Sequence, residues 1–186
     1  RFDSFWELPP DWEQRFGPVD RLSDISIWCP REGTYPTRAR ILDQTNGWVT
    51  KVDDWGRIVR SRAGAYFEEI LEVPIPPGCD PDSIEFDPPD LDLRYAIDGG
   101  DALATAQRLA QDKKHYCVFG KTGGPYLRTS FVRGTEQFLM DISADPQLAR
   151  ALVERMADHL IAIAVEQLHR WDLHETGVWI YDDMAH

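Results

Sequence analysis

The chain has 186 residues, 42% of them hydrophobic, which is enough to bury a sizeable core in one domain. With 20 basic and 32 acidic residues its formal net charge is -12, which argues against nucleic acid or an anionic membrane surface as the main partner. The three cysteines are odd in number and widely spaced, which argues against a disulfide framework and favours a reducing compartment.

No apolar run approaches the roughly 20 residues of a membrane span, and no basic segment followed by an apolar one opens the chain. These features predict a cytoplasmic protein. The chain begins at Arg1 rather than Met, and it stops at His186, directly after an apolar strand pattern. A parallel fold would next need a loop and a helix, so we expect an interior fragment of a longer protein.

The first predicted elements are a short helix at residues 11–17, docked through aromatic side chains, and a strand at residues 23–29. Asp24 lies near the start of that strand. Its carboxylate is a candidate site group, and a solvated residue at the strand end is the alternative interpretation.

Residues 34–73 have the pattern of a small antiparallel meander. Asn46-Gly47 is a strong signal for a two-residue hairpin because both positions accept a positive φ, and the DDWG segment at 53–56 predicts a second turn. Residues 74–89 are rich in proline and aspartate, which predicts an irregular connection.

Residues 98–186 predict a βαβ core. The expected elements are a helix at 98–114, a strand at 116–119, a helix at 135–142, a long helix opening at Asp145-Pro146 and a closing strand at 178–181. A core-facing stripe recurs along the long helix at spacings of three and four: Leu148, Leu152, Met156, Leu160 and Ile163. A strand, a long crossover and a second strand fit both an open doubly wound sheet and a closed (β/α)8 barrel.

The tip of the first of these strands is predicted to be a glycine-loosened loop. It contains Gly120, Gly123, Gly124 and Pro125. Loops at the carboxyl ends of parallel strands are where such folds bind their ligands. The sequence therefore predicts a substrate-binding loop here.

Two carboxylates, Asp182 and Asp183, follow the closing strand. Adjacent carboxylates in a partly dry pocket push their pKa values apart and suit acid/base work, metal binding or the capture of a cation. The alternative is that one of them caps the next helix.

Arg128 and Arg133 follow the glycine loop and have the right chemistry to hold a carboxylate or a phosphate. Ion pairs with Glu136 or Asp141 explain them equally well. Of the two, Arg128 is taken as a candidate substrate-binding residue.

The segments GKTGGPYLRTSF, RGTEQFLMDISADPQLARALVERMADHL and GVWIYDDMA, in this order and spacing, resemble the uroporphyrinogen decarboxylase superfamily. This superfamily includes the haem-pathway decarboxylase and corrinoid-dependent methyltransferases. The resemblance implies an α/β fold of the (β/α)8 barrel type, incomplete in this chain, with residues 1–186 as part of one domain. The hairpin region at 34–73 would be an insertion into it.

The resemblance also implies roles for individual residues. Asp24 in SDI is similar to the decarboxylases' aspartate that faces the pyrrole nitrogens, and Gly120, Gly124 and Pro125 match their G-x-x-G-x-P loop. Phe131 stands where the decarboxylases have a functional tyrosine, and we expect it to pack against a flat macrocycle. The Asp182-Asp183 pair departs from their acidic residue followed by a serine.

These departures favour methyl transfer to or from a corrinoid carrier protein over decarboxylation, because an added carboxylate pair disfavours a polyanionic porphyrinogen. The resemblance implies zinc and corrinoid as possible cofactors, with zinc ligands beyond His186 and none visible in this chain. The expected ligand is a small molecule, a tetrapyrrole or a corrinoid. Uroporphyrinogen decarboxylation and a non-catalytic fragment remain the alternatives.

Overall fold

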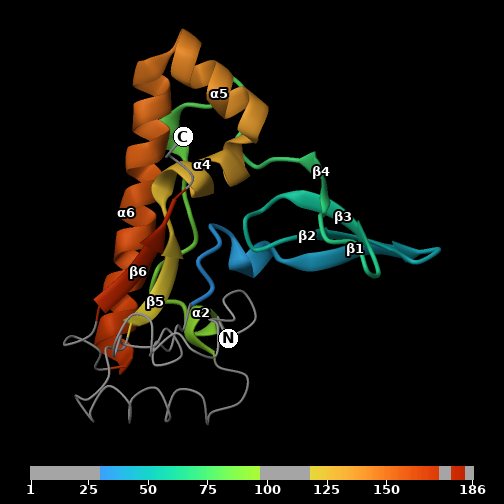
Figure 1. Ribbon diagram of the computed structural model, residues 1–186, viewed down its shortest axis with the longest axis horizontal. Coiled ribbons are helices and arrows are strands. Elements are labelled where there is room, and N and C mark those ends of the chain that lie inside the picture. Colours follow the sequence, from blue (N-terminus) through green and yellow to red (C-terminus); the bar gives the residue numbers. More distant parts are fainter. Residues whose placement is uncertain (1–29, 97–117, 172–176, 183–186) are drawn as a thin grey trace, which may run out of the picture.

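The computed structural model describes residues 30–96, 118–171 and 177–182 (Figure 1). Within these ranges the chain forms a four-stranded antiparallel sheet and a two-stranded parallel sheet. The antiparallel sheet projects to one side of a body made of the parallel strands and the helices α4, α5 and α6 (Figure 1).

The antiparallel sheet is a meander in the order β1-β2-β3-β4. Its strands are β1 (Arg40–Thr45), β2 (Trp48–Val52), β3 (Ile58–Arg62) and β4 (Glu69–Glu72). Asn46 and Gly47, between β1 and β2, have φ angles of 52° and 77°, as a two-residue hairpin turn requires. The predicted meander is confirmed, and we call residues 40–72 the arm.

The body is a βαβ unit in which β5 (Val118–Gly123) pairs in parallel with β6 (Gly177–Tyr181). Three helices connect the strands: α4 (Pro125–Arg133), α5 (Thr135–Ala144) and α6 (Pro146–Trp171). The parallel connection and the last two helices are confirmed. The prediction of a loop starting at Gly120 is wrong because β5 continues to Gly123, and the sequence patterns missed α4.

Asp145 begins α6 as predicted. Its Oδ1 accepts a hydrogen bond from the backbone N of Leu148 at 3.0 Å, and Pro146 takes the first helical position. The predicted stripe is buried at Leu152, Met156, Leu160 and Ile163 and partly buried at Leu148. It packs on the irregular segment 74–89 through Ile75 and Ile84.

Three short elements complete the described chain: η3 (Pro36–Arg38), η4 (Pro81–Ser83) and α2 (Asp92–Tyr95). The predicted elements at 11–17, 23–29 and 98–114 lie outside the described residues. None of the helices in the described ranges is both long and apolar enough to cross a membrane.

Arg94 holds together two segments that are far apart in the sequence. Its side chain is 1% exposed and donates to the carbonyl oxygens of Arg31, Gly33, Asp87 and Pro88 at 2.7 to 2.9 Å. Burial lowers the pKa of the Arg94 guanidinium. Its charge is balanced by aligned carbonyl dipoles, so the contact is between a cation and backbone.

The prediction of a (β/α)8 barrel is wrong. Among the described residues only β5 and β6 are parallel, whereas the other four strands form an unclosed antiparallel sheet. A barrel requires parallel strands that close on themselves. One βαβ unit is common to many architectures, so its pattern did not distinguish a barrel from the small mixed α/β fold observed.

We expect Arg94→Met to lower the free energy of unfolding by roughly 3–5 kcal/mol, because it leaves buried carbonyl groups without donors. Chemical denaturation followed by circular dichroism measures the change. Arg150→Met is the matched control, since the Arg150 side chain is 79% exposed. Equal stability of the two variants would contradict the role of Arg94.

Candidate functional site

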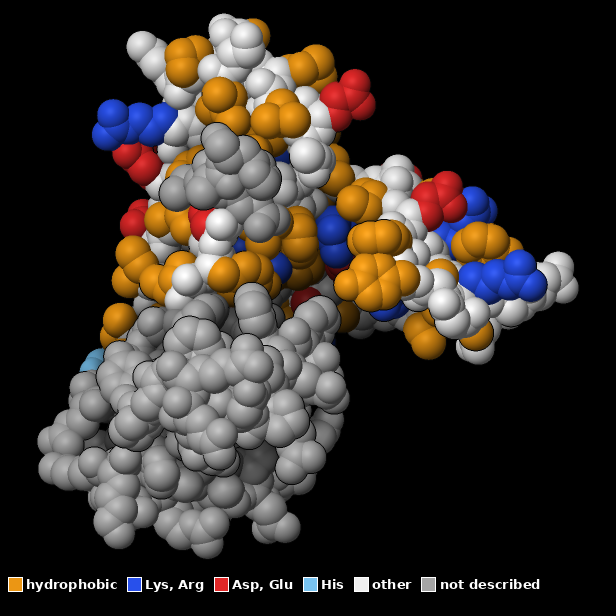
Figure 2. All heavy atoms as spheres, viewed as in Figure 1, with side chains coloured by type: hydrophobic (Ala, Val, Ile, Leu, Met, Phe, Trp, Pro, Cys, Tyr) orange, Lys and Arg blue, Asp and Glu red, His pale blue; other side chains and the backbone are white. Residues whose placement is uncertain are grey.

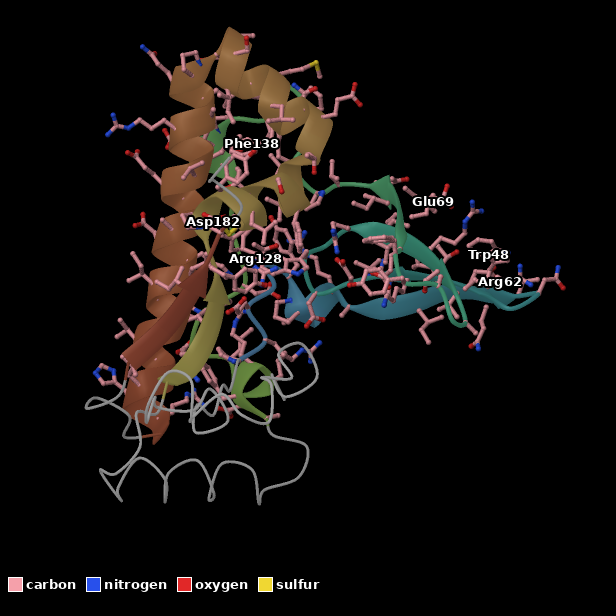
Figure 3. The ribbon with its side chains drawn as sticks, in the orientation of Figure 1. Trp48, Arg62, Glu69, Arg128, Phe138 and Asp182 are labelled. Atoms are coloured by element: carbon pink, nitrogen blue, oxygen red, sulfur yellow. The ribbon has the colours of Figure 1, made fainter. Side chains whose placement is uncertain are left out.

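The parallel pairing of β5 and β6 brings the two predicted site segments to one edge of the body. Gly123, the last residue of β5, is opposite Tyr181, the last residue of β6. Beyond them lie Gly124, which caps the start of α4, and Asp182 (Figure 3). Segments separated by more than fifty positions in the printed sequence therefore meet at the carboxyl edge of the sheet.

Lack of space explains the two glycines at this edge. A Cβ on Gly123 would overlap the guanidinium of Arg128, and one on Gly124 would overlap the carboxylate of Asp182. Gly124 has φ -66° and ψ 163°, which any residue adopts. The glycines are thus required for close approach of side chains rather than for an unusual backbone conformation.

Asp182 caps α4 from outside the helix. Its Oδ2 accepts from the backbone N of Tyr126 at 3.0 Å, and its Oδ1 accepts from the N of Leu127 at 2.7 Å. These N–H groups have no partner within the helix, and a negative charge there also complements the helix dipole. Helix capping was the alternative interpretation of this carboxylate, but it concerned the next helix, whereas Asp182 caps α4, which precedes it in the sequence.

A buried ion pair lies beside this cap. Arg128 Nη2 donates to Glu32 Oε2 at 3.0 Å and to the Tyr181 hydroxyl at 3.1 Å. The backbone N of Gly123 also donates to Glu32 Oε2, at 3.4 Å. The side chains of Arg128 and Glu32 are only 12% and 6% exposed, so each charge depends on the other.

Aromatic rings enclose the guanidinium of Arg128. It lies over the rings of Trp55, Phe131 and Tyr181, with 4.8, 5.1 and 5.7 Å from its central carbon to the ring centroids. The Arg57 guanidinium also lies over Phe131, at 4.6 Å, and Trp55 meets the Phe131 ring edge to face. Phe131 therefore contacts protein cations and a tryptophan at this position.

Trp55 lies in the DDWG turn of the arm and Arg57 directly follows it, so their contacts with Arg128 and Phe131 join this turn to the edge of the body. The Asp53 carboxylate orders that turn by accepting from the backbone N of Trp55 and Arg57 at 3.0 and 2.9 Å. It also pairs with the Arg57 side chain at 2.7 Å. The predicted turn thus has a second role as the contact between arm and body.

His159 of α6 contacts the backbone of Glu32. Its Nε2 lies 3.0 Å from the Glu32 backbone oxygen, and its ring is 5.0 Å from that of Phe86. Burial lowers the pKa of His159 from 6.5 to about 4, and the Arg94 guanidinium adds to this effect. The ring is therefore neutral at pH 7 and donates its proton to the carbonyl.

The structure brings together Gly123, Gly124, Pro125, Arg128, Phe131 and Asp182 of the predicted site. Gly120 lies within β5, and Asp24 and Asp183 lie outside the described residues. Arg133 is not at the edge: it forms a buried ion pair with Asp141 at 2.6 Å, as the alternative interpretation predicted. This hydrogen bond holds the pKa of Asp141 below its usual range.

Sequence analysis missed Glu32, Trp55, Tyr181 and His159. Glu32 and His159 carried no motif, and Trp55 was assigned only to a turn. Tyr181 was assigned only to a strand, yet it is the last residue of β6, and residues at strand ends line the edge of a parallel sheet. The position of Tyr181 at the end of a predicted strand could therefore have indicated it as a site residue.

The described residues do not fit a metal centre. Across 30–96, 118–171 and 177–182 no group of three or more His, Cys, Asp or Glu side chains is placed to hold an ion. Asp182 is occupied by helix capping and Glu32 by Arg128. Zinc has no ligand set in this part of the chain.

Comparisons with known proteins identify no relative. No family model matches the chain, and neither the curated proteins nor the solved structures contain a match.

We expect Asp182→Ala to destabilise the protein by about 1–2 kcal/mol, because two N–H groups of α4 lose their acceptor. Asp158→Ala, at an exposed position of α6, is the control and should cost under about 0.5 kcal/mol. Thermal and denaturant melts measure both. A loss no larger than that of the control would contradict the cap.

The neutral His159 makes stability depend on pH. Its folded pKa is below the unfolded value, so its contribution is complete above pH 6.5 and is lost as pH falls from 6.5 towards 4. The shift corresponds to roughly 3 kcal/mol at full effect. We expect denaturation at a series of pH values to show that the free energy of unfolding falls more steeply below pH 6.5 in the wild type than in His159→Gln. Parallel plots of this free energy against pH for the two proteins would contradict the role of His159.

Proposed function

We propose that the protein is an enzyme related in activity to the uroporphyrinogen decarboxylase superfamily and that its reaction is methyl transfer to or from a corrinoid. The reaction would take place at the carboxyl edge of β5 and β6. A closed barrel is not part of this proposal.

One observation carries the proposal: the two segments of strongest resemblance meet at a single edge. Asp182 lies directly against Gly124 of the glycine motif and caps α4, which begins at Pro125, although the two motifs are distant in sequence. Ligands of α/β proteins bind at the carboxyl ends of parallel strands, which gives this convergence a functional meaning.

The charge at the edge favours methyl transfer over decarboxylation of uroporphyrinogen. The described charged groups there are three carboxylates, of Glu32, Asp53 and Asp182, and two guanidinium groups, of Arg57 and Arg128. Arg57 is already paired with Asp53, and Arg128 with Glu32. A porphyrinogen with many carboxylates needs an excess of positive charge. A methyl group carried on a corrinoid has no such requirement.

The corrinoid is proposed as the group of a separate carrier protein and enters as substrate. Trp55 and Phe131 pack on each other and under guanidinium groups, so a macrocycle would have to displace these contacts to stack on them. In this reaction a thiol would lose its proton to water and its sulfur would form a bond to the methyl carbon, while the cobalt–carbon bond would break with its electron pair left on the cobalt of the carrier. The chain's own contribution is an edge held rigid by Glu32, Arg128 and Asp182.

The proposed location is the cytoplasm, supported by the odd and widely spaced cysteines. The proposed partner is a corrinoid carrier protein. Zinc is left out of the mechanism because the described residues do not fit it.

The test uses the purified full-length natural protein with methylcobalamin and a thiol, followed by visible spectroscopy. Loss of the methylcobalamin spectrum together with methyl thioether formation is expected. A parallel incubation with uroporphyrinogen, analysed by chromatography, detects decarboxylation. If the protein decarboxylates uroporphyrinogen and transfers no methyl group, decarboxylation replaces methyl transfer as its activity. If it catalyses neither of the two reactions, the proposal is overturned in favour of a non-catalytic chain.

Asp183→Ala in the same assay should lower turnover by at least about tenfold if that carboxylate contacts substrate. Asp158→Ala is the matched control and should leave turnover unchanged. Zinc analysis of the same preparation, made without added metal, extends the test. About one zinc per chain, lost together with activity on chelation, would place thiol activation on ligands outside the described residues.

A further inference from the structure

The outer strands of the arm, β1 and β4, are its two edges. Among the described strands β1 pairs only with β2, and β4 pairs only with β3 (Figure 1). All six residues of β1 and all four residues of β4 are exposed. An edge strand presents unpaired backbone N–H and C=O groups, to which a strand of another chain can add.

The two edges have the same apolar centre, an isoleucine followed by a leucine. These residues are Ile41 and Leu42 on β1 and Ile70 and Leu71 on β4, and they are between 44% and 64% exposed. Figure 2 shows hydrophobic side chains at the surface of the arm. The strand register leaves Leu42 without an opposite residue on β2 and Leu71 without one on β3, so each leucine is the extra residue of a β-bulge.

On β1 this apolar centre lies between two charges of opposite sign, Arg40 and Asp43. Within the described part of the chain neither of them forms an ion pair. Arg40 donates to the carbonyl oxygen of Arg38 at 3.1 Å, and Asp43 accepts from the hydroxyl of Thr45 at 2.9 Å. Both charges are therefore available to a partner strand.

The bulge places these two charges on one face of the arm. Arg40 lies opposite Val52 and Asp43 lies opposite Thr50, and these two residues of β2 share a face because they are two positions apart. In a strand without a bulge, residues three positions apart would point to opposite faces. A second copy of β1 that runs antiparallel to the first can therefore bring its own Asp43 to the face that carries Arg40.

Charge distinguishes the three ways of joining two such edges. In the register that opposes the two apolar centres, β1 with β1 makes two attractive pairs, each between Arg40 and Asp43. Pairing β4 with β4 would oppose Glu69 to Glu72 twice, and pairing β1 with β4 would make one attractive and one repulsive pair. Like charges directly opposite each other destabilise paired strands. Only the pairing of β1 with itself is favourable at both positions, and it also closes on a two-fold axis.

We propose that the chain forms a two-fold symmetric dimer in which β1 of each copy pairs antiparallel with β1 of the other. Arg40 lies opposite the partner's Asp43, and Ile41 opposite the partner's Leu42. The two four-stranded meanders then join into one continuous sheet, and backbone hydrogen bonds between the edges supply affinity. The bulge opposes the addition of a regular strand, whereas in a second copy the same bulge brings both charges to the required face.

The dimer is expected to be weak. The paired segment, residues 40–43, is far smaller than the roughly 20–30 residues a side of a standard interface. We therefore expect a dissociation constant of about 10–100 µM.

The test is sedimentation equilibrium of the full-length natural protein up to about 500 µM. Asp43→Arg and Arg40→Asp each turn both attractive pairs into repulsive ones, and each should raise the dissociation constant at least about tenfold. Asp158→Arg, at an exposed position of α6, changes the net charge as Asp43→Arg does and should leave the dissociation constant unchanged. Because the chain has a net charge of -12, a general charge effect of Asp43→Arg would strengthen association instead.

Mixing the two variants tests the register directly. In an equimolar mixture of Asp43→Arg and Arg40→Asp, opposite charges face each other again at both positions. The mixture should dimerise with a dissociation constant within about threefold of the wild type. Circular dichroism checks that each variant keeps its fold.

Three results would overturn the proposal. A wild type that is still monomeric at about 500 µM would leave this edge to a partner of another kind. A dimer of Asp43→Arg as tight as that of the wild type, or a mixture of the two variants that stays monomeric, would show that β1 does not pair with itself.

Discussion

The carboxylate and carbonyl of Glu32 connect both parallel strands with the helices α4 and α6. The carboxylate accepts from Arg128 on α4 and from the end of β5, and the backbone oxygen meets His159 on α6. Through Arg128 the same network reaches Tyr181 on β6. Because the pair is buried, removing either charge would leave the other unsolvated, so the elements around it must keep their positions. The preceding residue, Arg31, is held by Arg94, which places Glu32 at the edge.

The side chains that form this network also crowd the backbone at the edge. The side chains of Arg128 and Asp182 occupy the space that a Cβ on Gly123 or Gly124 would need. Glycine is therefore required at positions 123 and 124 because charged groups lie directly against the backbone at the strand ends. This is a different requirement from the positive φ of Gly47, where the surrounding space is open and only the conformation matters.

The arm contacts the carboxyl edge of the body through packed side chains. Trp55 and Arg57 in the second turn of the arm pack on Arg128 and Phe131, so the meander extends from the candidate site. Seven of the thirteen large hydrophobic residues that are exposed in the described chain lie on this arm.

The sequence by itself determined the local features: the Asn46-Gly47 hairpin, the Asp145 cap with its proline, the buried stripe of α6 and the parallel βαβ connection. Each depends on residues within one or two turns or on a repeating period, so the physical cause is visible in a short window. It also indicated Gly124 and Asp182 as neighbours at a sheet edge. Tertiary structure alone decided that Asp182 caps an earlier helix, that Glu32 pairs with Arg128, and that the described strands do not close into a barrel. Those outcomes depend on contacts between distant residues and on which surfaces remain to be covered, and a local pattern does not contain that information.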